Sequence, residues 1–86
     1  MPYEVLLGKS ARKTYERLGP KLRQGLDRCI AFLEVSPEAG PNIQRLVNHP
    51  GCWRYRVGGW RILYEVDEER KEVRIYEIRP RGDVYK

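Results

Sequence analysis

The chain has few of the residues that most often build metal and redox sites. It contains a single histidine, His49, and two cysteines, Cys29 and Cys52, among 86 residues. The cysteines do not have CxxC spacing, which favours reduced thiols in a cytoplasmic protein over a disulfide or a nucleophile. No set of histidine, cysteine and carboxylate residues occurs at ligand spacing, so we expect no metal site and no cofactor. His49 is expected to be an ordinary loop residue, because it has no second histidine to share acid and base work.

Long apolar runs are also missing. No stretch approaches the roughly 18 apolar residues that cross a bilayer, so no contact with a membrane is expected. The first residues, Met1 to Leu7, lack a basic region and a cleavage-type small residue, and are expected to belong to the mature protein. Hydrophobic residues make up 41% of the chain and charged residues 34%. This composition and length predict one folded domain, residues 1–86.

Positive charge is in excess, and most of it is carried by arginine. The formal net charge is +5, and twelve of the 17 basic residues are arginine. The planar guanidinium group grips phosphate oxygens in pairs, and each phosphate contact releases counterions. The composition therefore suits a polyanionic partner such as a nucleic acid. Genome composition or thermophily would explain the arginine content equally well.

The first part of the chain has the spacing of helices. A short apolar run at residues 3–7 predicts a strand, which Gly8 ends. Ser10 is expected to cap a first helix, and Pro20 to open a second one after Gly19. One face of the first helix is apolar: Ala11, Tyr15 and Leu18. The second helix has a longer apolar stripe: Leu22, Leu26, Cys29, Ile30 and Leu33.

The two helices are expected to form a hairpin. Gly25 lies inside the second helix, where a close approach of the two helices would explain it. The stretch from Ser36 to Gly51 is rich in proline, asparagine and glycine and is predicted to be irregular. Three apolar residues are expected to attach it to the core: Ile43, Leu46 and Val47.

From Cys52 onward the pattern changes to strict alternation, which is typical of strands with two unlike faces. Three strands are predicted, at about residues 53–57, 60–66 and 72–79. Gly58-Gly59 predicts a two-residue hairpin turn, and residues 67–71 a looser one. The predicted order is strand, helix, helix, strand, strand, strand. We therefore expect an α+β fold in which a mostly antiparallel, twisted sheet carries the helical hairpin on one face.

The tight turn fixes which residues of the hairpin lie opposite one another. Because Val57 pairs with Trp60, Arg56 pairs with Arg61, and Arg54 lies on the same face as both. Like charges opposite one another destabilise a sheet by some tenths of a kcal/mol, and a bound anion would remove that penalty. A solvated face, with charges balanced by nearby glutamates, is the other interpretation. The opposite face is expected to pack on the helices: Trp53, Tyr55, Val57, Trp60, Ile62 and Tyr64.

The end of the chain adds two candidate residues. Pro80 is expected to end the last strand and Gly82 to let the chain turn, which would present Arg81 and Tyr85 beyond the sheet edge; a disordered basic tail is the alternative. The segments 53–66 and 78–86 resemble the C-terminal half of RelE/ParE-superfamily toxins. Those toxins share a hydrophobic-basic strand, a glycine turn, an aromatic-Arg-hydrophobic-hydrophobic-Tyr strand, and a closing Arg and Tyr. The order of elements resembles theirs over nearly the whole chain, and the ending resembles the RelE branch.

RelE-type toxins are messenger-RNA endonucleases that act in the ribosomal decoding site and are held inactive by an antitoxin. The resemblance implies a RelE-like, microbial-ribonuclease-like fold and a cytoplasmic, metal-independent endoribonuclease that inhibits translation. It implies as partners a cognate antitoxin, with a heterotetramer as one arrangement, and messenger RNA in the A site of the 30S ribosomal subunit. The implied catalytic residues are Arg61, Arg81 and Tyr85. The implied phosphate-binding residues are Arg54, Arg56 and Arg79.

Within this scheme Tyr85 would act as general base or stack on an RNA base. Some relatives have lysine where this chain has Arg54 and Arg56, and arginine practically cannot give up its proton. These two positions are therefore expected to act only through their charge, and Arg81 or water is left to protonate the leaving oxygen. Two alternatives stay open: a ParE-like toxin that poisons DNA gyrase without cutting, and a nucleic-acid-binding domain without activity. An apolar groove for the antitoxin is expected along the helical hairpin or the sheet edge.

Overall fold

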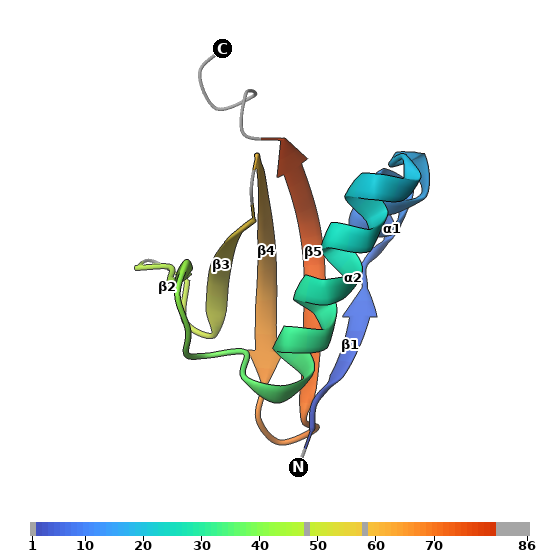
Figure 1. Ribbon diagram of the computed structural model, residues 1–86. Helices are drawn as coiled ribbons and strands as arrows, with labels where there is room; N and C mark the ends of the chain where they lie inside the picture. The colour runs from blue at the N-terminus through green and yellow to red at the C-terminus, as the bar shows by residue number, and fades with distance from the viewer. Residues whose placement is uncertain (1, 48, 58, 81–86) are drawn as a thin grey trace.

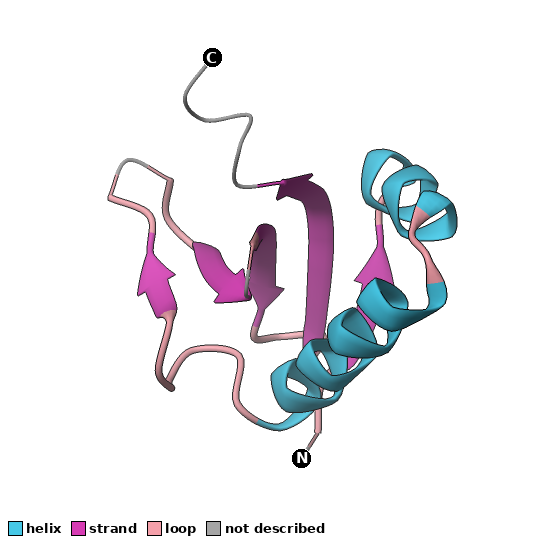
Figure 2. Cartoon of the chain, turned by 45° about the horizontal axis from the view of Figure 1, so that its top comes forward, coloured by secondary structure: helices cyan, strands magenta, loops and turns pink. Residues whose placement is uncertain are grey.

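The computed structural model describes residues 2–47, 49–57 and 59–80. Their elements follow in the order β1 (Glu4–Leu7), α1 (Lys9–Arg17), α2 (Pro20–Val35), β2 (Ile43–Arg45), β3 (Cys52–Val57), β4 (Trp60–Asp67) and β5 (Glu72–Pro80). Both helices lie on one side of the sheet (Figures 1 and 2). The α+β fold predicted from the sequence is confirmed, with one strand more than expected. Neither α1 nor α2 has the length and apolar character that crossing a bilayer would take.

The strands form one sheet in the order β1-β5-β4-β3-β2. β1 runs parallel to β5, and the other neighbours are antiparallel. The additional strand β2 pairs with β3 through three residues, with Ile43 opposite Tyr55. A strand of this length is too short to show an alternating pattern, so the sequence predicted an irregular segment there. Ile43 packs against the core as expected, whereas Val47 is 93% exposed and does not attach the segment to the core.

Helix α1 starts two residues earlier than predicted, and Ser10 lies inside it rather than capping it. The residue before the helix is Gly8, whose N–H donates to the carbonyl oxygen of Ile75 at 2.8 Å. A Cβ at Gly8 would lie 3.3 Å from that oxygen, which is a tight contact. The hydrogen bond to β5 therefore sets where the helix starts. Pro20 opens α2, as predicted.

The predicted helical hairpin is confirmed by contacts around Tyr15. Its hydroxyl donates to Asp27 Oδ1 at 2.6 Å, and the guanidinium carbon of Arg23 lies 5.4 Å from the centre of its ring. The reason suggested for Gly25 is wrong, because a Cβ built there would meet nothing within 4 Å in the described part of the chain. Leu22 is 46% exposed, so the buried stripe of α2 begins only at Leu26.

The core lies between the helices and the sheet. Tyr64 is the largest of its fully buried side chains, and the Tyr64 hydroxyl donates to the carbonyl oxygen of Pro37 at 2.6 Å. The aromatic residues of the β3–β4 hairpin therefore serve as core rather than as a platform for bases, since Tyr55 and Trp60 also pack against it. The other buried members are Ala11, Leu18, Leu26, Cys29, Leu33, Ile62, Val66, Val73, Ile75 and Ile78. Cys29 and Cys52 are free thiols.

Strand β5 carries one extra residue relative to β4. Ile75 lies opposite Tyr64 and Glu77 opposite Leu63, which leaves Tyr76 as a β-bulge. Because side chains alternate along a strand, the bulge changes which later residues face the core. Ile78 is buried after it, and Arg79 lies on the outer face.

Candidate active site

Three arginines lie side by side on the face of the sheet that points away from the helices. The register places Arg56 of β3 opposite Arg61 of β4, and Arg61 opposite Arg79 of β5. We call these three residues the arginine row. Neighbouring strands are about 4.8 Å apart, so the row brings three positive charges close together. The pairing of Arg56 with Arg61 is the one that the glycine turn predicted.

The members of the row have different surroundings. Arg56 is exposed, and Arg61 is half-buried. The Arg61 Nε atom is buried and has no hydrogen-bond partner among residues 2–47, 49–57 and 59–80. Arg79 is paired with Glu77 through its Nε atom. Within the same residues, neither Arg56 nor Arg61 forms an ion pair with a carboxylate.

Carboxylates gather at the opposite end of the sheet. The guanidinium group of Arg74 lies 2.9 Å from Glu72 and 3.7 Å from both Glu65 and Asp67. Lys71 is paired with Glu68 at 3.1 Å. The interpretation of a balanced, solvated face therefore holds for Arg74 and for Arg79. It does not hold for the described surroundings of Arg56 and Arg61, so the turn end of the β3–β4 hairpin stays positive.

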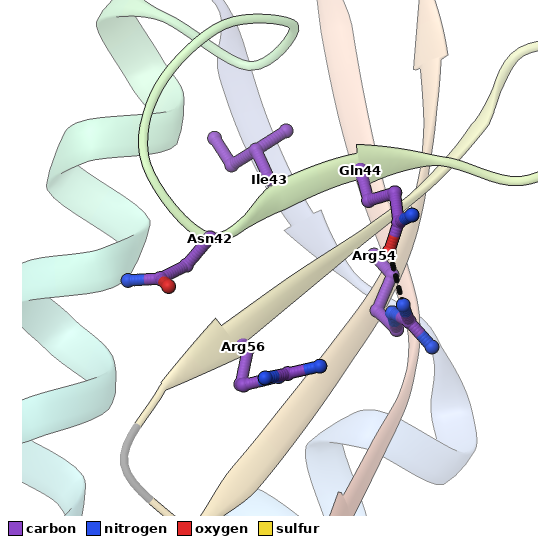
Figure 3. Close-up of a pocket in the computed structure, with 5 residues that line it drawn as sticks. All are labelled: Asn42, Ile43, Gln44, Arg54 and Arg56. Carbon is purple, nitrogen blue, oxygen red and sulfur yellow. Dashed lines mark hydrogen bonds between the residues drawn. The ribbon is translucent and has the colours of Figure 1, made fainter.

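Arg54 lies on the same face, next to the new strand β2. It is opposite Gln44 in the register, and its Nη2 atom donates to the Gln44 Oε1 atom (Figure 3). A cavity of about 310 Å³ opens here. Its lining residues are Asn42, Ile43, Gln44, Arg54 and Arg56.

The loop before β2 is fixed against β3 at Arg56. The backbone N–H of Arg56 donates to the carbonyl oxygen of Asn42 at 2.9 Å. Asn42 has a φ of 70°, a left-handed conformation that asparagine tolerates better than most residues. Sequence reasoning missed Asn42 and Gln44 as candidate site residues because it did not predict β2. The sequence does place two amide residues, Asn42 and Gln44, two positions apart and upstream of β3, and this spacing is the only sign of them that could have been used.

Two of the catalytic residues that the resemblance implied, Arg81 and Tyr85, lie outside the described residues. His49 is exposed, in the segment between β2 and β3. The part of the chain that the structure describes holds no group of three or more histidine, cysteine or carboxylate residues placed for a metal ion. The described portion of the candidate site thus consists of arginines, with two amide side chains beside them.

Residues 5–85 match the family described as the ParE toxin of the type II toxin-antitoxin system, parDE. The chain belongs to the RelE/ParE toxin superfamily. The Toxin RelG of Mycobacterium tuberculosis is 30% identical to this superfamily member over 89 aligned positions, which cover 100% of this chain and 99% of RelG. The resemblance predicted from the strand-turn-strand pattern is therefore confirmed, and the protein is a toxin of a type II toxin-antitoxin system.

Solved structures of RelE/ParE toxins share the fold. The RelBE2 toxin-antitoxin complex of M. tuberculosis contains a chain with a TM-score of 0.81 and 26% identity, and the match covers 96% of this chain and 95% of that one. A chain of the archaeal RelE-RelB complex from Pyrococcus horikoshii has a TM-score of 0.83 and 24% identity, with 95% and 98% covered. The mixed sheet with two helices on one face is thus the architecture of these toxins.

Proposed function

We propose that this toxin is an endoribonuclease that cuts messenger RNA in the A site of the 30S ribosomal subunit and thereby inhibits translation. The observation that carries the proposal is the arginine row. Two of its members, Arg56 and Arg61, have no paired carboxylate among the described residues. Three adjacent guanidinium groups suit a phosphodiester, and suit its transition state better, because negative charge on the phosphate oxygens increases there.

The proposed reaction uses the RNA's own 2′-hydroxyl. Its oxygen attacks the adjacent phosphorus, the bond from phosphorus to the 5′ oxygen breaks, and the products are a 2′,3′-cyclic phosphate and a free 5′-hydroxyl. One proton leaves the 2′-hydroxyl and one joins the 5′ oxygen. The protein has to align attacking and leaving oxygens and neutralise the developing charge, and no metal takes part in the proposed scheme.

Arg61 is proposed as the central phosphate ligand, because it lies between Arg56 and Arg79. No carboxylate among residues 2–47, 49–57 and 59–80 neutralises its guanidinium group, so its charge is available to a phosphate. Arg56 and Arg54 would cradle the phosphate through charge alone, since guanidinium groups keep their protons. Arg79 would contribute less than Arg61, because Glu77 already neutralises part of its charge.

Arg81 and Tyr85 complete the proposed catalytic set. Arg81 would hold the scissile phosphate together with Arg61. Tyr85 would be the general base or would stack on an RNA base. The ordinary pKa of a tyrosine is near 10, and guanidinium groups placed beside Tyr85 would favour the phenolate, which is the form that accepts a proton.

A cognate antitoxin is proposed as the partner in the cytoplasm. The similar toxin chains from M. tuberculosis and P. horikoshii were solved in complexes with RelB-type antitoxins. An apolar groove at a sheet edge was predicted as the binding site for the antitoxin. Strand β1 forms one edge of the sheet, because β5 is its only neighbour in the described sheet. A cavity of about 340 Å³ opens there beside Leu6, which is 37% exposed. Its lining residues are Val5, Leu6, Leu7 and Arg12.

Primer-extension mapping tests the proposal. The full chain is incubated with ribosomes that carry a defined messenger RNA, beside the Arg61→Ala chain and beside Arg70→Ala, which removes an exposed arginine of the β4–β5 turn. We expect new 5′ ends within A-site codons for the wild type and Arg70→Ala, and their loss for Arg61→Ala. Intact transcripts together with gyrase-dependent DNA damage would refute the nuclease and favour gyrase poisoning, the activity of the ParE-like alternative.

A further inference from the structure

We infer that the cavity beside Arg54 binds an unpaired base of the RNA whose phosphate the arginine row holds, and that the Gln44 amide contacts the edge of this base. The inference rests on the proposed function, because it assumes an RNA strand across the row. The cavity adjoins the row through Arg56, which belongs to both. A nucleotide whose phosphate lies on the row therefore has room for its base beside β2.

Gln44 is held in one orientation. Its Oε1 atom accepts a hydrogen bond from Arg54, and Figure 3 shows the amide nitrogen on the other side of the group, turned away from Arg54. This nitrogen forms no hydrogen bond within the described residues. An amide that is fixed on one side and free on the other presents directed donors, which is what the recognition of a base edge needs.

The opposite side of the cavity offers a flat cation. The guanidinium group of Arg56 extends toward the side on which Arg54 lies, and unpaired RNA bases stack on such planes (Figure 3). The backbone hydrogen bond from Arg56 to Asn42 fixes the loop that lines this side. The cavity volume of about 310 Å³ lies at the lower end of small-ligand sites, which span about 300 to 1,000 Å³.

A base fits this cavity better than a second phosphate does. A phosphate would use the charges of Arg54 and Arg56, but one of these is already engaged with the Gln44 oxygen. The amide of Gln44 carries no net charge to attract a phosphate. It offers hydrogen-bond donors that point in a fixed direction instead. A base uses all three features: a stacking plane, a directed donor and a space of limited size.

The direct test follows the side-chain amide signals of the full-length chain by nuclear magnetic resonance. The chain has two glutamines, Gln24 and Gln44, and Gln24 is exposed on α2, so it serves as an internal control. The four ribonucleoside 5′-monophosphates are added in turn, and ribose 5-phosphate is the base-free probe. We expect the Gln44 amide signals to move several-fold further with nucleotides than with ribose 5-phosphate, and the Gln24 signals to stay in place. Equal movement with both kinds of probe would overturn the inference.

A second test uses cleavage. Gln44→Met keeps the length of the side chain and removes its amide, and Gln24→Met is the matched control. We expect Gln44→Met to change the ratio of cleavage among A-site codons by roughly fivefold, the size of one lost hydrogen bond. Arg79→Ala removes charge from the arginine row and leaves the hydrogen bond between Arg54 and Gln44 in place, so it should lower cleavage at all codons alike. An unchanged codon profile for Gln44→Met would overturn the inference and leave the nuclease intact.

The two proposals fail in different ways. A wild-type chain that cuts no RNA, but whose Gln44 signals depend on the base, would refute the nuclease and support the base site. A chain that cuts RNA, but whose Gln44 signals move equally with nucleotides and with ribose 5-phosphate, would support the nuclease and refute the base site.

Discussion

Arg56 and Arg61 lie directly opposite one another on antiparallel strands, and neither has a carboxylate partner among residues 2–47, 49–57 and 59–80. This arrangement costs stability, because like charges in directly opposed positions repel. The buried Nε atom of Arg61 adds to the cost, since an unsatisfied buried donor is unfavourable. A site that is strained without its ligand should be relieved when an anion binds, and this relief can be measured.

The first prediction concerns anion binding at the row. We expect inorganic phosphate to raise the thermal midpoint of the wild-type chain more than that of Arg56→Gln, because a ligand that binds only the folded state stabilises it. Without phosphate, Arg56→Gln should be more stable than the wild type by some tenths of a kcal/mol. Arg70→Gln removes an exposed charge from the β4–β5 turn and serves as the control for a general salt effect. Equal responses of all three chains would show that the row holds no phosphate.

The second prediction concerns how much Arg61 contributes to the rate of cleavage. Loss of a preorganised donor to the developing charge lowers the rate of cleavage by about 100- to 1,000-fold. We expect this loss for Arg61→Lys as well as Arg61→Ala, because an ammonium group cannot grip two phosphate oxygens at once. The readout is the rate of cleavage at one codon on programmed ribosomes. Arg79→Ala should lose less, because Glu77 already engages that side chain.

The third prediction uses two glycines with opposite surroundings. Gly25→Ala should stabilise the fold by up to about 1 kcal/mol, because the helix gains propensity and the new Cβ meets open space. Gly40→Ala should destabilise it, because Gly40 has a φ of 146° and a Cβ there would lie 2.7 Å from the ring of Phe32. Urea unfolding measures both. A destabilised Gly25→Ala chain would indicate a helix contact that the described residues lack.

The fourth prediction concerns the buried hydroxyl of Tyr64. Tyr64→Phe leaves the carbonyl oxygen of Pro37 without this donor, which should cost about 1 to 3 kcal/mol of unfolding free energy. Tyr76→Phe is the matched control, because Tyr76 is exposed. Chemical denaturation distinguishes the two variants. If both variants lose the same unfolding free energy, the hydrogen bond to Pro37 contributes no more to stability than the hydroxyl of Tyr76 does.

The fifth prediction is that the unfolding free energy depends on pH through the hydrogen bond between Tyr3 and Glu68. The Tyr3 hydroxyl donates to both carboxylate oxygens of Glu68, at 2.9 and 3.0 Å. This hydrogen bond, followed by one from Lys71, lowers the pKa of Glu68 below its ordinary value. A lowered carboxyl pKa contributes stability that is present above the ordinary pKa, about 4.3 for glutamate, and is lost as the pH falls through the folded-state pKa.

Tyr3→Phe reads out this contribution. We expect the variant to be less stable than the wild type near neutral pH, and the difference to shrink as the pH falls below about 4. Glu38 acts in the opposite direction, because burial raises its pKa, so the comparison is made between variants rather than on one chain. A difference that stays constant through the acidic range would mean that the charge of Glu68 plays no part.

The sequence predicted what is set by short-range rules. A two-residue turn leaves only one register, and this alone placed Arg56 opposite Arg61. The contacts of β2, the bulge at Tyr76 and the start of α1 at Gly8 depend on residues that are distant in sequence. Apolar residues at 75, 76 and 78 do break the alternation of β5, but the position of the bulge is set by its pairing with β4. The roles of Arg81 and Tyr85 stay predictions.

The arginine row thus depends on the bulge in β5. If Tyr76 paired with Leu63 instead of forming the bulge, every later residue of the strand would swap sides, so that Arg79 would turn toward the helices and Ile78 toward solvent. All arginines would remain in the sequence, yet the row would lose a member. Variants that escape this toxin's activity can therefore be sought among changes that alter the pairing of β5 with β4 as well as among substitutions of the arginines, since a chain with the full set of site residues can still be inert.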